Sequence, residues 1–502
     1  MATERDFITP AGMTVTTTAN VVGNTAFVDA YSNTARAQTY PTFSQNFVMN
    51  PSLDSRWSFT RTSNATYLAA NGLVTTVGPN VPRFEYDPIS QQCKGLLLEE
   101  GRTNYAWNSD FASGNTNWSL YDGLNNQNCA LRSYAGTAPD GSNNAVFFYH
   151  TTDVNTYYVI YPTTNVTISN NVTYTYSVFF KANTSPQEPG ITLGQYNAPD
   201  NVNSIYLQFT LAANGSVTGW TDLGNGANVQ VHGVGSQNYP DGWVRVYYSF
   251  RYTTGNRTYV QFKHELNSGG LTPAAANTRG LYLWGAQLEQ GPFPTSFIPT
   301  PVNGNAIRNQ EFATITDDNL NTFKNENSMT IVDTIAPFGY HGNTTMTASS
   351  EQRYTGVWQL YNNPRPATPG NLFNPPVGFN YGQYFTDQST DSRYLNDGVT
   401  PNRIQRYVGM FNQVETYIGF NTFDLAVNNY ISNATSITTA TTMRSNNYIM
   451  VTNGSLSSTT LNYFAGANNN TLMIGSLNGY FKKIAVYGRQ LSNAEMISIT
   501  TT

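Results

Sequence analysis

The chain contains few charged residues. Asp, Glu, Lys and Arg make up 11% of its 502 residues, against about 25% in typical globular proteins. Disorder is not the reason, because disordered chains lack aromatic residues and this chain is 14% aromatic. The net charge of −5 argues against a nucleic-acid partner, since phosphate binding requires clustered Lys and Arg. Asn, Thr, Ser and Gln supply the polarity instead, and they suit strands and turns.

Long apolar runs and cysteines are also scarce. No run of 18 apolar residues is present, so we expect no membrane insertion. The first residues, Met1 to Asp6, lead into polar sequence without the apolar core of a secretory signal, which predicts synthesis and assembly in a cytoplasm. In such a reducing compartment the two cysteines, Cys93 and Cys129, are expected to be free buried thiols.

Period-two patterns dominate what is present. Apolar residues alternate along Arg279–Glu289, and a turn with Pro292 and Pro294 follows. Alternation also occurs at 173–180 and 243–250, with Gly, Asn and Pro between such segments. Strands about every ten residues indicate antiparallel sandwiches. At this length, two or three domains are expected.

One predicted strand and the segment after it have a distinctive amino-acid sequence. Residues 284–289 read W-G-A-Q-L-E and residues 295–300 read T-S-F-I-P-T. This pair resembles the closing strand of a carbohydrate-binding-module-like jelly roll that recurs in virion proteins of tailed bacteriophages. The resemblance implies a jelly roll over residues 105–300, with Trp118 in its core.

Residues 51–104 resemble a β-rich linker module found upstream of jelly rolls in phage proteins. Asn71-Gly72 predicts a tight hairpin there, because both residues tolerate positive φ. Glu99, Glu100 and Arg102 could suggest a catalytic carboxylate pair. We interpret them instead as a structural ion-pair and hydrogen-bond cluster at a domain junction.

Residues 1–50 have too little apolar surface for a core of their own. Their opening resembles the N-termini of structural proteins in phages of marine cyanobacteria, which implies attachment to other virion proteins. The alternative is a loose terminus. Attachment together with the uncharged surfaces predicts a homo-oligomer, with a trimer favoured.

Residues 301–502 form the last expected unit. Gly479–Tyr487 predicts a strand, and Ser492 with Glu495 forms a capping box that begins a short helix. This ending resembles the C-terminus of concanavalin A-like (laminin G-like) lectin domains. Between Gln352 and Asn402 the sequence is rich in Pro, Asn and Tyr, which predicts long loops.

Catalytic and metal motifs are not found. Glu85-Tyr86-Asp87 approaches a glucanase carboxylate motif, but Pro88 interrupts it and the last Glu is missing. The four histidines, at 150, 232, 264 and 341, show no metal spacing. Asp387, Asp391 and Asp397 lack the EF-hand pattern and are interpreted as a solvated loop. We therefore expect no enzyme activity, no metal and no cofactor.

Carbohydrate binding requires only aromatic faces and polar neighbours. The Tyr-rich stretch offers seven candidate glycan-binding residues, namely Trp358, Tyr361, Arg365, Tyr381, Tyr384, Phe385 and Tyr394. The structural alternative is that these aromatics are core or trimer contacts.

Taken together, the residues and resemblances predict an all-β protein: tandem antiparallel jelly-roll β-sandwiches after an extended N-terminal segment. The expected function is a virion fibre or appendage of a tailed phage that attaches to host-surface glycans. A capsid decoration or tail structural protein is the alternative, and a polysaccharide depolymerase ranks third.

Overall fold

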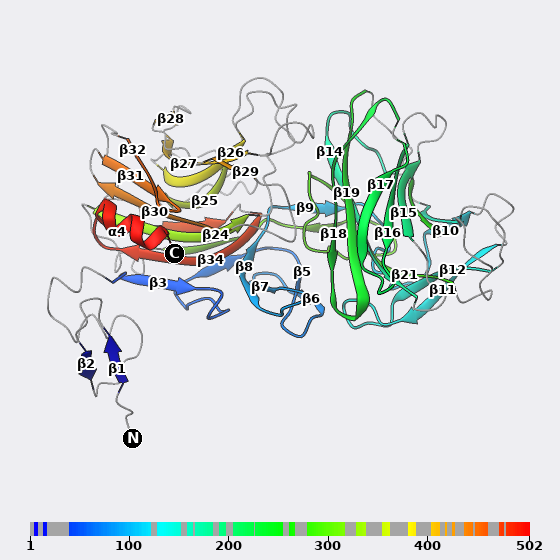
Figure 1. Cartoon of the computed structure of the whole chain (residues 1–502), viewed down its shortest axis with the longest axis horizontal. Helices are drawn as coiled ribbons and strands as arrows, with labels where there is room; N and C mark the ends of the chain where they lie inside the picture. The colour runs from blue at the N-terminus through cyan, green and yellow to red at the C-terminus, as the bar shows by residue number, and fades with distance from the viewer. Residues whose placement is uncertain are drawn as a thin grey trace.

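The computed structural model describes two sandwiches and the segments that join them (Figure 1). The described residues are 5–8, 14–17, 40–121, 128–151, 158–163, 166–183, 190–196, 204–224, 226–254, 261–266, 279–316, 328–337, 354–361, 380–387, 403–411, 417–418, 424–426, 436–444, 447–459, 471–475 and 478–501. All described strand pairs are antiparallel, and the fold class is all-β, as the sequence predicts. Strands β1 (Arg5–Ile8) and β2 (Thr14–Thr17) form a separate hairpin.

The first sandwich consists of two six-stranded sheets, drawn mainly in cyan and green (Figure 1). One sheet has, in order, β10 (Trp118–Tyr121), β13 (Tyr158–Pro162), β20 (Gln261–Leu266), β15 (Gly190–Tyr196), β16 (Ile205–Leu211) and β17 (Val217–Asp222). The other has β11 (Cys129–Gly136), β12 (Ala145–His150), β21 (Gly280–Gln290), β14 (Thr173–Ala182), β19 (Trp243–Tyr252) and β18 (Val229–Asn238). Trp118 is buried between the sheets, as expected.

A bulge in β21 modifies the alternation that the sequence suggests. Leu281 and Leu283 point into the core, but the next core residues are Ala286 and Leu288, so the phase shifts by one position. Gly285 lies at this shift with φ of 67°, and a Cβ there would lie 2.7 Å from a ring carbon of Phe179. Only glycine fits this conformation and contact. The bulge brings Trp284 into a cluster outside the sandwich core.

The second sandwich also contains two sheets, of eight strands each. One has β28 (Tyr417–Ile418), β27 (Arg403–Phe411), β26 (Asn380–Asp387), β25 (Tyr354–Tyr361), β33 (Thr471–Gly475), β23 (Phe312–Thr316) and β4 (Ser58–Thr60), with β29 (Asp424–Ala426) beside β27. The other has β32 (Ser455–Thr459), β31 (Asn447–Thr452), β30 (Ile437–Arg444), β24 (Ser328–Pro337), β34 (Gly479–Tyr487), β8 (Cys93–Leu98) and β7 (Arg83–Tyr86), with β3 (Phe43–Asn46) beside β34.

The second sandwich is therefore built from segments that precede and segments that follow the first sandwich in the sequence. Strands β3, β4, β7 and β8 precede the first sandwich in sequence but pair with β34 and β23, which follow it. Leu96 and Leu98 of β8 share a core with Ile484 and Val486 of β34. A division of the chain at 50, 104 and 300 does not describe this topology, because residues 43–98 complete the C-terminal sandwich. The reason is that β34 needs a hydrogen-bonding partner on its second edge.

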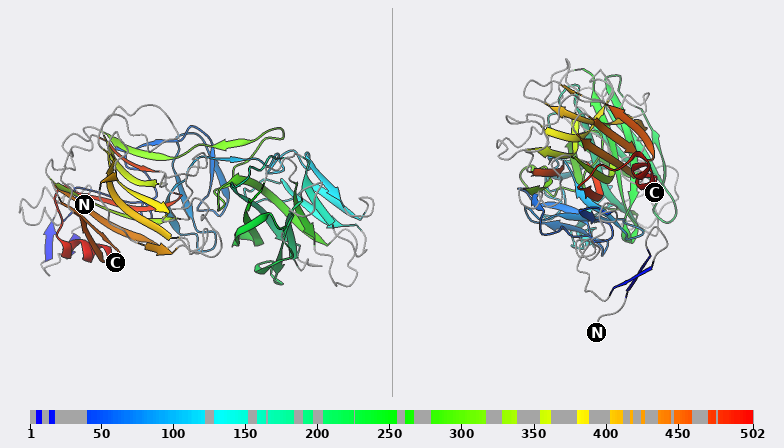
Figure 2. Two further views of the ribbon diagram at one scale, coloured as in Figure 1. Left: turned by 90° about the horizontal axis from the view of Figure 1, so that it is seen from above. Right: turned by 90° about the vertical axis from the view of Figure 1, so that its left-hand side faces the viewer.

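Two short antiparallel pairs lie between the sandwiches, which are arranged end to end (Figure 2). In β9 (Arg102–Asn104) and β22 (Ala306–Arg308) the chain enters and leaves the first sandwich. The hairpin of β5 (Ala65–Leu68) and β6 (Val74–Val77) confirms the turn expected at Asn71-Gly72, although only Gly72, with φ of 79°, takes a positive φ. Leu68 and Val74 of this hairpin pack with Trp284 and Phe179 on the outer face of the first sandwich.

Several local predictions are confirmed. The capping box of Ser492 and Glu495 starts helix α4 (Asn493–Thr500), which packs Met496 against the outer face of β31 and β34. Cys93 and Cys129 are free thiols, and Cys129 is buried while Cys93 is half-buried. Among the described helices, none has the length and apolar character that crossing a membrane requires.

Candidate functional site at the junction of the sandwiches

One of the seven candidate residues from the sequence is part of the core. Trp358 lies in β25 with 0% of its surface exposed, and its indole Nε1 donates to Oδ1 of Asp333 at 3.3 Å. It packs with Ile474 of β33 and other apolar residues of the second sandwich. A ring that is fully enclosed cannot stack on a sugar, so assigning Trp358 to glycan binding was wrong.

The other candidates are located only in part. Tyr361 ends β25, whereas Tyr381, Tyr384 and Phe385 belong to β26, which pairs with β25 and β27. The expected long loops between Gln352 and Asn402 therefore include two paired strands. Outside the described residues lie Arg365, Tyr394, Asp391 and Asp397, whereas Asp387 ends β26.

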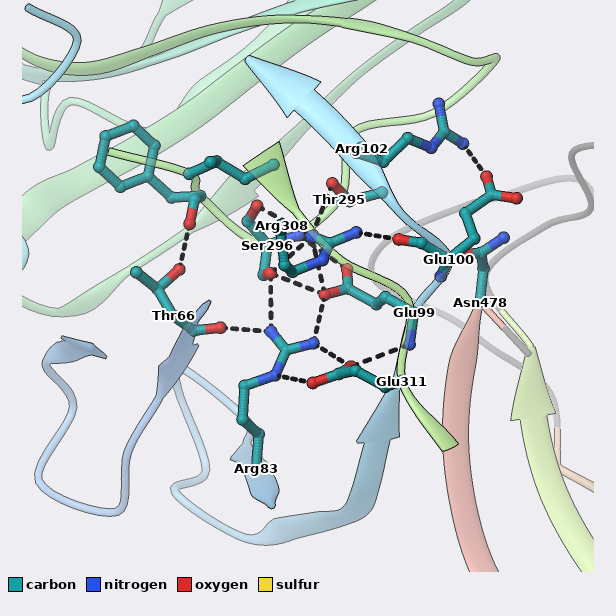
Figure 3. A network of polar contacts seen from close by, with 12 residues as sticks. Thr66, Arg83, Glu99, Glu100, Arg102, Thr295, Ser296, Arg308, Glu311 and Asn478 are labelled. Atoms are coloured by element: carbon teal, nitrogen blue, oxygen red, sulfur yellow. Dashed lines mark hydrogen bonds and ion pairs between the residues drawn. The ribbon is translucent and has the colours of Figure 1, made fainter. Parts of the chain in front are cut away.

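The most concentrated chemistry lies where the two sandwiches meet (Figure 3). Glu311, just before β23, is fully buried and accepts from two arginines. Arg61 Nη1 lies 2.6 Å from its Oε1, and Arg83 Nε donates to the same oxygen at 2.8 Å. Arg83 Nη2 also pairs with Oε2 of Glu311, and the backbone N–H of Glu99 donates to that oxygen at 3.0 Å. Every carboxylate oxygen of Glu311 is thus satisfied.

Glu99, which directly follows β8, is held in the same way. Its Oε2 lies 2.7 Å from Arg83 Nη2 and 3.0 Å from Arg308 Nη1. Ser296 donates its backbone N–H at 2.8 Å and its hydroxyl at 2.6 Å. Because Ser296 belongs to the first sandwich and Arg83 to the second, Glu99 ties the two together.

A third pair extends the cluster. Glu100 forms an ion pair with Arg102, and its backbone N–H donates to Oδ1 of Asn478 at 3.0 Å. Gly291 lies against Arg102 so closely that a Cβ would be 1.6 Å from Nη1. The interpretation of Glu99, Glu100 and Arg102 as a structural cluster is confirmed. We call the whole set the junction network, which consists of Arg61, Arg83, Glu99, Glu100, Arg102, Ser296, Arg308 and Glu311.

The electrostatics of Glu99 oppose a role in acid–base catalysis. Burial by itself would raise the pKa of Glu99, but Arg308, Arg83 and Ser296 outweigh burial and lower this pKa to about 2. Near neutral pH a general acid needs a pKa close to the working pH. Glu99 is instead a permanent anion with no accessible surface. Glu99 therefore has no proton to donate near neutral pH.

A small cavity of about 50 Å³ lies beside the network, and we call it the junction cavity. Its lining comes from the β5–β6 hairpin, from β7 and β8, from the outer face of the first sandwich and from β34. The lining residues are Thr66, Tyr67, Leu68, Val74, Glu85, Leu97, Glu99, Phe179, Gln237, Tyr239, Arg245, Pro294, Thr295, Ser296, Phe297 and Tyr480. Four polar members, Tyr67, Glu85, Gln237 and Tyr239, are half-buried, so solvent reaches them.

Glu85 is the unusual group of this cavity. Its Oε2 accepts the backbone N–H of Leu68 at 2.9 Å. Burial raises its pKa to about 7, although Lys94 and the Leu68 N–H act in the opposite direction. Asp87, two residues on, accepts from the backbone of Ile89 and Ser90 in an exposed turn. Glu85 thus lines the cavity while Asp87 caps a turn, and this agrees with rejecting the two carboxylates as a catalytic motif.

The described histidines do not form a cluster. His264 is buried in the first sandwich, where its Nε2 is 2.8 Å from the hydroxyl of Tyr176. Burial lowers the pKa of His264 to about 3, so it is neutral. His150 is buried in β12 and His232 is half-buried in β18, while His341 is outside the described residues. Within the part of the chain that is described, no group of three metal-ligating side chains occurs.

Comparison with known proteins gives distant matches only. No protein-family model matches, and no curated protein matches. Among solved structures, the Ruminococcus gnavus IT-sialidase CBM40 is 16% identical, with a TM-score of 0.23, over 37% of this chain and 91% of that one. Mouse laminin alpha1 domains LG4-5 are 9% identical, with a TM-score of 0.15, over 66% of this chain and 89% of that one.

A leech intramolecular trans-sialidase complexed with 2,7-anhydro-Neu5Ac is 16% identical, with a TM-score of 0.23. That match covers 37% of this chain and 25% of the leech chain. Similarity at this level assigns neither a ligand nor an activity to the chain.

Proposed function

We propose that this chain is a non-catalytic virion protein of a tailed bacteriophage, a fibre or appendage that displays its sandwiches toward host-surface glycans. The observation that carries the proposal is the junction network. Glu99 and Glu311 are fully buried and fully paired, and Ser296 of the first sandwich donates its backbone N–H and its hydroxyl to Glu99, so the network ties the two sandwiches together. Rigid display of β-sandwiches suits attachment, whereas hydrolysis requires accessible carboxylates.

Two further features support this role. The closing strand of the first sandwich, including W-G-A-Q-L-E at 284–289, resembles strands of phage virion proteins. Among the described residues before position 50, β1 and β2 pair with each other, and β3 joins the second sandwich through β34. In this proposal the residues before β3 attach the chain to other virion proteins, and the chain forms a homo-oligomer, most simply a trimer.

The glycan contacts are proposed for the aromatic stretch between Gln352 and Asn402. Six residues of the aromatic stretch remain candidates, namely Tyr361, Arg365, Tyr381, Tyr384, Phe385 and Tyr394. Trp358 is excluded by its burial. If these aromatics are core or subunit contacts instead, the alternative role is a capsid decoration or tail protein without receptor binding.

Three measurements test the proposal. Labelled antibody on intact particles should mark the tail periphery, and purified protein should bind host envelope polysaccharide without releasing reducing ends. Light scattering should show a multimer. Labelling spread over the head, together with no glycan binding, would favour capsid decoration. Reducing ends whose release an Asp or Glu substitution abolishes would establish a depolymerase.

A further inference from the structure

Three aromatic rings lie together on the outer face of the first sandwich, on the sheet that contains β11, β12, β21 and β14. Phe147 and Tyr149 alternate along β12 with residues of the sandwich core, so they point away from that core. Tyr282 of β21 is the cross-strand partner of Phe147. The ring centroid of Phe147 lies 5.3 Å from that of Tyr149 and 4.8 Å from that of Tyr282. Phe147 is buried, whereas both tyrosines are half-buried and present part of their surface to solvent.

A cation lies on each side of these rings. Arg132 of β11 is the cross-strand partner of Phe147, and Lys181 of β14 is the partner of Tyr282. Arg132, Phe147, Tyr282 and Lys181 therefore form one row on the same face of four neighbouring strands. At about 4.8 Å between strands, the row spans about 14 Å from the first Cα to the last. We call these four residues, together with Tyr149, the outer platform.

The guanidinium of Arg132 is exposed but held over the rings. Its Cζ lies 5.9 Å from the ring centroid of Phe147 and 5.3 Å from that of Tyr149. Cation–π attraction restrains the side chain in this position, so less conformational freedom is lost when it binds a ligand. A guanidinium offers five N–H donors and no acceptor, and its planar edge matches a carboxylate in bidentate geometry.

The two cations have no anion of their own. Among the residues that the structure describes, neither Arg132 nor Lys181 forms an ion pair or a side-chain hydrogen bond, and the hydroxyls of Tyr149 and Tyr282 are likewise without a partner. The outer platform thus presents two positive charges and four side chains able to donate hydrogen bonds, in a chain whose net charge is −5. Charge complementarity favours an anionic ligand.

The rings narrow the choice of anion. Half-exposed aromatic rings beside a cation suit a ligand that has an apolar C–H face and a carboxylate, and an acidic sugar carries both on one ring. A free phosphate has no apolar face. An acidic peptide that adds as a strand needs a free strand edge, but β12, β21 and β14 are each paired on both sides.

We propose that the outer platform is a glycan subsite for a carboxylate-bearing sugar, a hexuronic acid, in a host polysaccharide. The inference rests on the proposed glycan attachment and deepens it, by naming a class of sugar and the residues that recognise it. Arg132 pairs with the carboxylate, and the rings of Tyr149 and Tyr282 contact the C–H face. Because the row is longer than one sugar ring, Lys181 contacts the next acidic sugar of the chain.

A matched pair of probes tests the role of the carboxylate. Oligogalacturonate has a carboxylate on each ring, whereas its methyl ester has the same rings without the charge. Calorimetric titration of the full-length protein at low ionic strength should give a dissociation constant for the acid at least about tenfold lower than for the ester. Added salt should reduce the difference, since exposed charges are screened. Equal affinities, or no binding of either probe, would overturn the proposal.

Variants link the effect to the outer platform. Arg132→Gln removes the guanidinium, so affinity for oligogalacturonate should fall about tenfold while affinity for the ester stays the same. Lys181→Gln should lower the affinity for the acid by a smaller factor. Lys483→Gln is the matched control, because Lys483 is exposed on β34 of the second sandwich and its loss removes one positive charge away from the platform. A loss in the control equal to that in Arg132→Gln would mean that only net charge matters, and the subsite would be rejected.

Another copy of the chain is the competing occupant of this face. In that case Arg132→Glu should dissociate the multimer in light scattering, and neither probe should bind the unmodified protein. That pair of results would replace the glycan subsite by a subunit interface. A multimer that is unchanged in Arg132→Glu, together with lost binding of oligogalacturonate, supports the subsite.

Failure of this inference is separable from failure of the proposed function. If the protein binds host polysaccharide and Arg132→Gln binds it equally well, attachment stands and the subsite is rejected. If host polysaccharide does not bind while the protein still prefers oligogalacturonate to its ester, the subsite stands and host attachment is rejected.

Discussion

Glu99 and Glu85 show how one junction holds two kinds of carboxylate. Both line the junction cavity and come from neighbouring segments, at the end of β8 and within β7. Glu99 is paired with Arg83 and Arg308, and its pKa is lowered to about 2. Glu85 has a single backbone donor, and its pKa is raised to about 7. Burial acts alike on both, and the number of cationic partners decides the outcome.

The paired carboxylates stabilise the junction, whereas Glu85 remains available for other contacts. Each oxygen of Glu99 and Glu311 is committed to a partner inside the protein, so these groups stabilise the junction and cannot contact a ligand. Glu85 keeps an uncommitted oxygen in a cavity that solvent reaches. Position beside a domain junction is therefore a poor guide to function unless the partners of each side chain are known.

The largest expected loss of stability comes from removing one of the fully paired carboxylates. Glu311→Ala leaves the guanidinium groups of Arg61 and Arg83 buried without their shared anion, which should cost about 3–5 kcal/mol of unfolding free energy. Urea and thermal unfolding would measure it. The control is Asp54→Ala, because the Asp54–Arg56 pair has side chains 33% and 32% exposed. That loss should be about 1 kcal/mol or less.

Trp358→Ala tests whether Trp358 is a structural core residue. A fully buried indole leaves a large cavity on removal, so about 3–5 kcal/mol should be lost. Trp220→Ala removes a ring that is 49% exposed on β17 and should cost clearly less. Thermal melting of both variants distinguishes the cases. A folded Trp358→Ala protein of near-normal stability that no longer adsorbs to host cells would restore Trp358 as a glycan residue.

The pH dependence of stability should show both carboxylates with opposite signs. Glu99 has a folded pKa below its ordinary 4.5, so its contribution is complete above pH 4.5 and is lost as pH falls toward 2. Glu85 has a raised pKa, so its contribution is complete below pH 4.5 and is lost as pH rises through 7. Each change amounts to at most about 3 kcal/mol.

Glu85→Gln isolates the part of the pH dependence of stability that is due to Glu85. The charged and titratable groups around Glu85 remain unchanged in the variant, namely Lys94, Arg83, Glu99, Tyr239 and Tyr480 together with Tyr67 and Arg245 of the same cavity lining. We expect the variant to lose the decline between pH 4.5 and 7 and to keep the acid-side loss due to Glu99. Chemical denaturation at several pH values measures this, and parallel curves for both proteins would contradict the assignment to Glu85.

Local features of the fold could be predicted from the sequence because the signals lie within a few residues. Ser492 and Glu495 are three positions apart, and their capping box starts α4 as expected. The hairpin at Asn71-Gly72 forms because Gly72 adopts the positive φ that its turn requires, whereas Asn71 does not have positive φ. The apolar face of β14, with Tyr174 and Tyr176, follows from alternation alone. Oligomeric state, virion location and glycan binding stay predictions.

Tertiary structure decided everything that depends on remote partners. Arg83 and Glu311 are 228 residues apart, and Arg61 and Glu311 are 250 apart, so no spacing rule connects them. Nor could the sequence show that β8 and β7 extend the sheet beyond β34, or that Trp358 is enclosed while Glu85 has only one backbone donor. The sequence by itself determined the strands, turns and caps, because these depend on short-range backbone preferences. Burial and charge pairing were decided only when the chain folded, because they depend on which distant segments come to lie together.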